Sequence, residues 1–257
     1  MMAKIDGFLK IVEKATLKGL VLDGLFIVEN KTCFIEGVES GAEVIYRLQG
    51  PVDMPDLGKL PISNLSYFTK VLGQFKGVDT EIHRDTENML TLEYEKRPWR
   101  FQLADEEKGI RHKLEDPTLI DDVLKDEEFS FPLIKGTCSE GIEYLSILES
   151  QKVFFNIKKD GMTYITGGGE QESGFDFWLG VGKAQKKEMI FEVYKEKLLA
   201  VMRSLEFVDE EPEEEGKLKR RRIASKNPTL GFRLNVQETP VAIFKQLPNI
   251  WLLTKIE

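Results

Sequence analysis

The segment Val153–Thr166, with the sequence VFFNIKKDGMTYIT, predicts a β-hairpin in the second half of the chain. Its central Asp160-Gly161 pair is favoured in tight hairpin turns, where the backbone needs positive φ angles. The first half holds another Asp-Gly pair, Asp23-Gly24, flanked by apolar residues. We therefore predict a matching hairpin over Gly19–Val28.

Helix patterns flank both predicted hairpins. Ile5, Phe8, Leu9 and Val12 recur at i, i+3, i+4 and i+7, which is typical of one apolar helix face. Further helices are predicted to begin near Ser63 or Asn64, which are good N-caps, and to span about Ser139–Lys152 and Tyr194–Glu206. Strands are predicted at Ala42–Leu48, Val78–His83, Met89–Tyr94, Trp99–Leu103, Phe175–Val181, Leu230–Val236, Val241–Leu247 and Ile250–Ile256.

The two halves thus repeat one order: helix, hairpin, strands, helix and three strands. Gly24 and Gly161 are 137 residues apart, and Leu72 and Met202, each on a second helix, are 130 apart. This order predicts a duplicated α+β unit with antiparallel sheets, with domains at 1–104 and 129–257. Two unrelated α+β domains with a similar order are the alternative. Residues 105–128 are acidic and predict an exposed interdomain connector, and 208–227 form a charged insertion.

Composition excludes several classes of protein. With 257 residues and 41% hydrophobic side chains, the chain can form two packed domains. We expect no membrane association and no secretory signal, because no apolar run approaches the ~20 residues of a membrane span. Cys33, Cys138, His83 and His112 are not paired at ligand spacing, so we expect no metal and no cofactor. No Walker A, G-x-S-x-G or H-E-x-x-H motif is present, which disfavours an enzyme.

Four segments resemble parts of one family of proteins, in the same order along the chain. Lys158–Tyr164 resembles the "KDG" hairpin in the second domain of proliferating cell nuclear antigen, and Ile62–Phe68 resembles the second helix of that family and of T4-like phage clamps. The residues from Glu238 to Phe244 and from Trp251 to Glu257 look like the family's last two strands. The resemblance implies a DNA polymerase sliding clamp with no catalytic site.

A homotrimeric ring around duplex DNA is what this resemblance implies for assembly. Helices would line the hole, and the replicative DNA polymerase and an ATP-dependent clamp loader would be partners. The last strand of domain one would pair with the next subunit's second domain, through interface residues Arg100, Phe101, Leu103, Phe175, Phe177 and Leu179. The protein would act in the cytoplasm, or in the nucleus or host cytoplasm where its DNA lies.

Basic residues on the predicted helices suit a ring that slides, because phosphate contacts carry no sequence information. Lys10, Lys14 and Lys18 follow a four-residue spacing opposite the apolar face. The other candidates, all expected off the apolar faces of their helices, are Lys70, Lys197 and Arg203. An ordinary solvated helix surface is the alternative. Glu140, Glu143 and Glu149 depart from the family, whose third helix is basic. The net charge of −8 requires that any basic surface be local.

The resemblance also implies a pocket for partner peptides with aromatic and aliphatic anchors. Its positions correspond to Ile120 and Leu124 in the connector and to Pro240 and Trp251 near the C-terminus. The alternative is that Trp251 belongs to the core. For the whole chain, the alternatives are a monomeric DNA-binding processivity or interaction protein of the same fold, and a structural virion protein. The basic run Lys217–Arg222 either touches DNA, acts as a localisation signal or neutralises its acidic neighbours.

Overall fold

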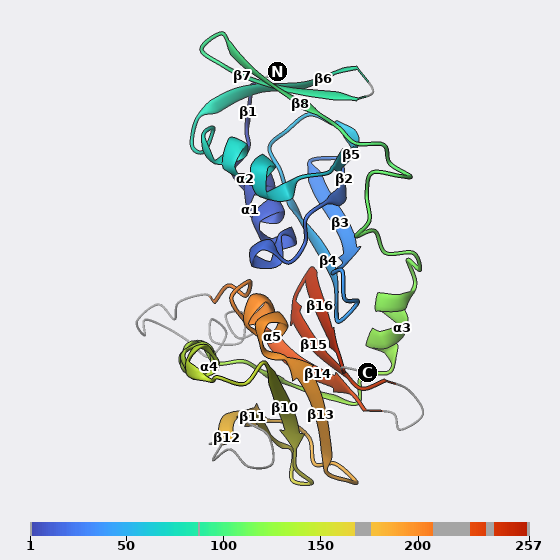
Figure 1. Cartoon of the computed structure of the whole chain (residues 1–257), viewed down its shortest axis with the longest axis vertical. Coiled ribbons are helices and arrows are strands. Elements are labelled where there is room, and N and C mark those ends of the chain that lie inside the picture. The colour runs from blue at the N-terminus through green and yellow to red at the C-terminus, as the bar shows by residue number, and fades with distance from the viewer. Residues whose placement is uncertain (1, 87, 168–175, 208–226, 235–238, 256–257) are drawn as a thin grey trace, which may run out of the picture. The chain divides into compact units, whose positions relative to one another are not determined.

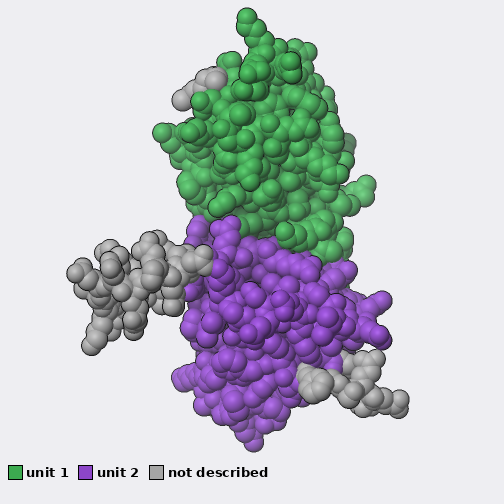
Figure 2. Space-filling view, turned by 90° about the vertical axis from the view of Figure 1, so that its left-hand side faces the viewer, with its two compact units in different colours: residues 1–117 green, residues 118–257 purple. Residues whose placement is uncertain are grey.

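The computed structural model describes residues 2–86, 88–167, 176–207, 227–234 and 239–255. The chain divides into two compact units, Met1–Pro117 and Thr118–Glu257 (Figure 2). The division falls inside the segment 105–128 that the sequence predicts as a connector. Both units combine helices with antiparallel sheets, so the predicted α+β class is confirmed.

Unit 1 contains two four-stranded sheets and two α-helices. One sheet has the strand order β1-β6-β7-β8 and the other has β5-β2-β3-β4. The elements are β1 Met2–Lys4, α1 Asp6–Ala15, the 3-10 helix η1 Leu17–Gly19, β2 Gly24–Glu29, β3 Thr32–Val38, β4 Val44–Pro51, β5 Gly58–Ile62, α2 Leu65–Gly73, β6 Asp79–Thr86, β7 Met89–Tyr94 and β8 Arg97–Gln102.

Unit 2 repeats this arrangement after one additional helix. Its sheets have the orders β16-β15-β14-β9 and β12-β11-β10-β13. The elements are α3 Leu119–Lys125, β9 Phe129–Pro132, α4 Lys135–Ile147, β10 Lys152–Ile157, β11 Met162–Gly167, β12 Asp176–Val181, β13 Met189–Tyr194, α5 Lys195–Met202, β14 Thr229–Arg233, β15 Val241–Gln246 and β16 Asn249–Thr254.

The two units share one topology, strand by strand. Each runs strand, helix, four strands, helix, three strands, and the opening strand pairs with the first strand after the second helix, as β1 with β6 and β9 with β14. By this correspondence β8 is equivalent to β16, and β4 to β12. The predicted duplication is confirmed at the level of topology.

Aromatic rings fill the core of unit 1. The Phe8 ring of α1 lies 5.8 Å from the Phe26 ring of β2 and 6.0 Å from the Phe68 ring of α2, centroid to centroid. Phe68 in turn lies 4.8 Å from Phe101 of β8. The two helices pack against each other (Figure 1). Their apolar faces are therefore buried and their other faces are left for solvent or a partner.

Glycines on β12 and just beyond it make room for rings in unit 2. A Cβ at Gly180 would overlap the Phe131 ring, and a Cβ at Gly182 would overlap the Phe129 ring. Phe129 and Phe131 also lie 5.3 Å and 6.5 Å from the Phe232 ring of β14. The two sheets of unit 2 thus meet where glycine on one faces phenylalanine on the other.

Only one of the two Asp-Gly hairpin predictions is correct. Asp160-Gly161 does connect β10 and β11, with Gly161 at φ +88°. Asp23-Gly24 is not a turn, because β2 begins at Gly24 and pairs with β3 through the turn residues Asn30 and Lys31. Both of these residues have positive φ, 53° and 56°, as the two-residue hairpin turn requires.

The predicted connector is not an exposed segment throughout. Its first part is fastened to unit 1: Asp23 Oδ1 accepts the backbone N–H groups of Arg111 at 2.9 Å and His112 at 3.0 Å. The His112 side chain is buried beside the same carboxylate. Burial, and after it the Asp23 charge, raises the pKa of the nearby Tyr46 hydroxyl.

The second part of the connector forms α3, where Ile120 and Val123 are buried. Glu127 then binds Lys245 of β15, and Glu128 Oε1 accepts the backbone N–H of Leu234 at 2.9 Å. The predicted exposure of the connector is therefore wrong for Ile120 and Val123, whereas Asp121, Asp122 and Glu128 are exposed.

Candidate functional site

Lysines on α1 and α2 occupy the solvent-exposed sides of these two neighbouring helices. Lys10 and Lys70 are exposed, and Lys14 is half-buried. α2 begins where Asn64 Oδ1 accepts the backbone N–H of Tyr67 at 3.0 Å, and Leu65, Phe68, Val71 and Leu72 form its buried face. Packing of these apolar faces therefore directs Lys10 and Lys70 outward.

The predicted placement of Lys18 on the same helix is wrong. α1 ends at Ala15, and Lys18 lies in the short 3-10 helix η1 with φ 58° and ψ 28°. This left-handed conformation breaks the helical periodicity, so the spacing of Lys10, Lys14 and Lys18 no longer defines one face. Lys18 is nevertheless exposed.

The α-helices of unit 2 have a lower net charge than those of unit 1. Lys197 of α5 is buried, with a side chain that is 9% exposed, so the expectation that it faces solvent is wrong. Arg203 at the end of α5 is exposed and donates from Nη2 to Ser146 Oγ at 3.0 Å. Glu140 and Glu143 on α4 are exposed. Their charge would repel a polyanion on this side of α4.

Two of the four residues predicted for a peptide pocket are buried. Trp251 and Ile120 are both 0% exposed. Trp251 lies opposite Phe244 in the β15–β16 pair, and its neighbours Ile250 and Leu252 are buried as well. β16 is therefore covered on both faces, and the expectation that Trp251 is free to anchor a peptide is wrong. Leu124 and Pro240 are half-buried.

The strand β8 lies at one end of its sheet, where β7 is its only neighbour among the described residues. Arg100 is exposed on this strand, together with Arg97 and Trp99. Phe101 and Leu103, predicted for the same interface, instead point into the core of unit 1, with exposures of 9% and 3%. β8 thus presents its backbone edge and two guanidinium groups, rather than those apolar side chains.

The strand β12 has the same position in its own sheet, with β11 as its one described neighbour. Leu179 is buried, and the Phe177 ring stacks on Tyr144 of α4 at 5.5 Å. Asp176 and Trp178 are exposed. Phe175 lies outside the described residues, as does the charged segment 208–226.

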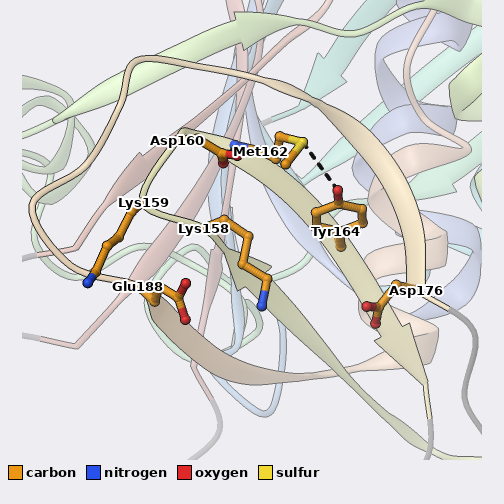
Figure 3. Close-up of a pocket in the computed structure, with 7 residues that line it drawn as sticks. All are labelled: Lys158, Lys159, Asp160, Met162, Tyr164, Asp176 and Glu188. Atoms are coloured by element: carbon orange, nitrogen blue, oxygen red, sulfur yellow. Dashed lines mark hydrogen bonds between the residues drawn. The ribbon is translucent and has the colours of Figure 1, made fainter.

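A surface that the sequence analysis missed lies at the end of the β10–β11 hairpin. An open groove of about 450 Å³ is lined by Lys158, Lys159, Asp160, Met162, Tyr164, Asp176 and Glu188 (Figure 3). The turn 158–161 resembles the family's KDG motif. The sequence patterns did not predict that this turn lies close to the segment that holds Lys183, Lys186 and Lys187. The clustering of lysines in residues 183–187 was the available signal.

Both cysteines lie in the described part of the chain, and their surroundings disfavour reactivity. Burial raises the pKa of the Cys33 thiol to about 12 and that of the Cys138 thiol to about 11, which disfavours the nucleophilic thiolate. Within the described ranges, no group of three or more His, Cys, Asp or Glu side chains is placed to hold a metal ion. No described helix has both the length and the apolar character to cross a bilayer.

Comparisons with known proteins identify the fold. No protein-family model and no curated protein sequence matches the chain. A solved structure of A. fulgidus PCNA with the C-terminal region of FEN-1 matches with a TM-score of 0.66 and 14% identity, covering 100% of this chain and 99% of the other. The PCNA2–PCNA3 complex from Sulfolobus tokodaii matches with a TM-score of 0.65 and 12% identity, covering 99% of both chains.

A bacterial clamp shares the same architecture over part of its length. The β clamp of Helicobacter pylori matches with a TM-score of 0.65 and 9% identity, covering all of this chain and 63% of that one. Identities this low establish the fold and not the activity. The chain has the fold of the DNA sliding clamps.

Proposed function

We propose that this protein is a processivity factor that encircles duplex DNA and tethers a replicative DNA polymerase to it. The observation that carries this proposal is the clamp fold over the whole chain, combined with exposed lysines on the paired helices α1 and α2. A tether of this kind needs no reactive group, which agrees with the buried thiols. Such a tether keeps a polymerase that has let go of the DNA close to it, so the effective concentration of polymerase at the DNA stays high and rebinding is fast.

Duplex DNA would be held through its phosphates. Lys10, Lys14 and Lys70 provide long cationic side chains on two adjacent helices, and Arg203 adds one from unit 2. Contacts to phosphate oxygens fix no sequence and exchange readily, so they permit sliding. Because Lys197 is buried and α4 bears Glu140 and Glu143, we expect unit 1 to contribute most of the attraction.

Ring closure would use the free edges of β8 and β12. An open strand edge presents unpaired N–H and C=O groups that favour pairing with another chain. β8 of one copy and β12 of the next form a heterologous contact, which closes into a ring when the rotation between copies fits. Arg100 stands on the face of β8 opposite the buried Phe101, and it would carry the charge opposite to that of Asp176 on β12 in such a pair. We propose a homotrimer on this basis.

Partners would include the polymerase and an ATP-dependent clamp loader that opens the ring. The A. fulgidus PCNA structure holds the C-terminal region of FEN-1, so a related fold binds a peptide from another protein. Leu124 and Pro240 remain as half-buried apolar positions for a similar contact in this chain. Trp251 would support such a surface from beneath, as part of the core.

The deciding experiment measures the mass of the assembly in solution and its retention on DNA. Multi-angle light scattering of the purified chain should give three times 29.5 kDa at micromolar concentration. The same sample should be retained on nicked circular DNA after loading and escape once the circle is cut, because a ring slides off a free end. A monomeric mass would favour the alternative, a one-faced DNA-binding protein of the same fold. A trimer that does not increase the length of DNA made per polymerase binding event would contradict the proposal.

A further inference from the structure

Two loops of unit 2 are fastened together at one end of the β12-β11-β10-β13 sheet. The backbone N–H of Gly182 donates to Gly161 O at 3.0 Å, and that of Gln185 donates to Lys159 O at 2.7 Å. Gly161 has φ +88°, and a Cβ there would overlap the carbonyl oxygen of Gly182. The turn 158–161 and the loop 182–188 are therefore held in fixed register to each other.

This register gathers five lysines, which are Lys158, Lys159, Lys183, Lys186 and Lys187. We call them the loop lysines. Four are exposed and Lys158 is half-buried. Asp160 and Glu188 are the acids of the same two loops, so an excess of three positive charges remains on a chain whose net charge is −8. Such a concentration of one sign creates a local positive field.

The loop lysines differ from many other lysines of this chain in lacking acidic partners. Lys152 pairs with Glu192 at 3.0 Å, Lys59 with Glu106 at 2.6 Å and Lys125 with Asp122 at 2.7 Å. Within the described residues, no loop lysine has a carboxylate within 4.0 Å. As far as the described residues go, their ammonium groups thus have no internal pair to break before they bind an external anion.

Aromatic side chains stand on the outer face of the same sheet. Tyr164 of β11 lines the same groove as Lys158 and Lys159, as Figure 3 shows. Trp178 of β12 is the direct partner of Tyr164 in the strand register, so both rings lie on one face. The Trp178 side chain is 41% exposed. Side chains stand perpendicular to a sheet, so pairing of the β12 backbone edge with another strand would leave this face open.

We propose that the loop lysines, with Tyr164 and Trp178, form a second nucleic-acid site, which binds single-stranded DNA or RNA. Cations that track the backbone, next to aromatic rings on which bases stack, are the two elements of sequence-tolerant single-strand binding. In a duplex the bases are stacked on one another, so none is available to stack on the exposed Trp178 ring. This site goes beyond the proposed clamping of duplex DNA, and it uses a sheet face of unit 2 rather than α1 and α2.

The test measures fluorescence anisotropy of labelled oligo(dT), oligo(U) and a duplex of equal length, over a series of salt concentrations. The triple variant Lys183→Ala, Lys186→Ala, Lys187→Ala should bind both single strands at least tenfold more weakly at low salt. Its slope of log K against log salt should become shallower by about 0.7 for each phosphate that the variant no longer neutralises. Trp178→Ala should weaken binding at least fivefold with little change in slope, because stacking is not ionic. Glu188→Gln should strengthen binding.

Two control variants separate this site from the proposed clamp function. Lys4→Ala, Lys108→Ala, Lys255→Ala removes the same charge from exposed positions elsewhere and should leave single-strand affinity unchanged. Lys10→Ala, Lys14→Ala, Lys70→Ala should lose duplex retention but keep oligo(dT) binding. Light scattering of every variant confirms that assembly is unchanged.

Three results would overturn the single-strand site. One is equal loss of affinity in the loop variant and the Lys4, Lys108, Lys255 control, which would mean non-specific attraction. Another is duplex binding as tight as oligo(dT) at this surface. The last is no measurable binding of oligo(dT) or oligo(U) at low salt. None of these results bears on whether the chain forms a ring.

Discussion

Asp23 Oδ1 accepts the backbone N–H of His112 at 3.0 Å, although the two residues are 89 positions apart in the chain. The same oxygen accepts the N–H of Arg111, and Asp23 as a whole residue is 6% exposed. Asp23→Ala leaves the buried donor of His112 and the part-buried donor of Arg111 unsatisfied, so the free energy of unfolding should fall by about 2 kcal/mol or more. Asp23→Asn keeps an oxygen that can accept these bonds, so it should recover part of the lost stability.

Denaturant titration measures the free energy of unfolding of both variants, and Asp79→Ala, at an exposed position, is the control. Equal unfolding midpoints for Asp23→Ala and Asp79→Ala would show that the contact is dispensable.

Removing the lysines of α1 and α2 should weaken DNA retention without loss of structure. For Lys10→Ala, Lys14→Ala, Lys70→Ala, we expect the dependence of DNA affinity on salt to become shallower by roughly 0.9 per lysine that contacts a phosphate. Filter binding or anisotropy on duplex DNA measures this slope. If the triple variant assembles like the wild type and supports equally long synthesis by the polymerase, these helices do not face DNA.

Trp251 should matter for stability more than for direct peptide contact. Because it is fully buried, Trp251→Ala should lower the free energy of unfolding by about 3–5 kcal/mol. Leu247→Ala, at a side chain that is 79% exposed, should change it by less than about 0.5 kcal/mol. Thermal and urea unfolding of both variants provide the comparison. A Trp251→Ala protein of wild-type stability that has lost a partner peptide would restore the pocket interpretation.

Charge exchange tests the proposed pairing of β8 with β12. Arg100→Glu gives β8 the same charge as Asp176 of β12 and should raise the dissociation constant of the assembly at least tenfold, about 1.4 kcal/mol. Adding Asp176→Arg to this variant restores opposite charges and should recover assembly. Sedimentation velocity over a concentration series measures the dissociation constant of the assembly for each variant. Failure of Asp176→Arg to rescue the Arg100→Glu variant would place Arg100 outside the interface.

Because both cysteine thiols are buried, we expect the protein to lose stability at alkaline pH. Burial raises their pKa from 9.0, to about 12 for Cys33 and about 11 for Cys138, so the folded state holds these protons more tightly than the unfolded state. Their contribution is therefore complete below pH 9 and is lost as the pH rises toward 11 and 12. Cys33→Ala should flatten the fall in unfolding midpoint above pH 9. Rapid native labelling of both thiols at pH 8 would argue against their burial.

Local patterns were sufficient to predict several elements. The apolar periodicity and the Asn64 cap located α2, and β7 was predicted with its observed bounds, Met89–Tyr94. These features depend on interactions between residues near in sequence. The positive φ angles of Leu17 and Lys18, which end the helical spacing, leave no comparable pattern in residue types.

Burial depends on contacts made far along the chain, and there the sequence analysis failed most. Alternation along β16 suggested a free face for Trp251, yet the continuous run Ile250–Leu253 is typical of a strand buried on both faces. Lys197 is buried among apolar neighbours on α5, where a long aliphatic stem can pack while its ammonium reaches Glu196 at 3.8 Å. The loop lysines are united by main-chain bonds between two turns, which no single segment reveals.

The glycine and phenylalanine pairs of unit 2 constrain how this protein can have changed over time. Gly180 faces Phe131 and Gly182 faces Phe129, about fifty positions away in each case. A larger residue at either glycine is tolerable only if the opposite ring has already become smaller, so the order of inherited substitutions matters. Descendants of one ancestor should therefore show these positions varying in linked pairs. Lineages that have lost the phenylalanines should be the ones in which the glycines were free to drift.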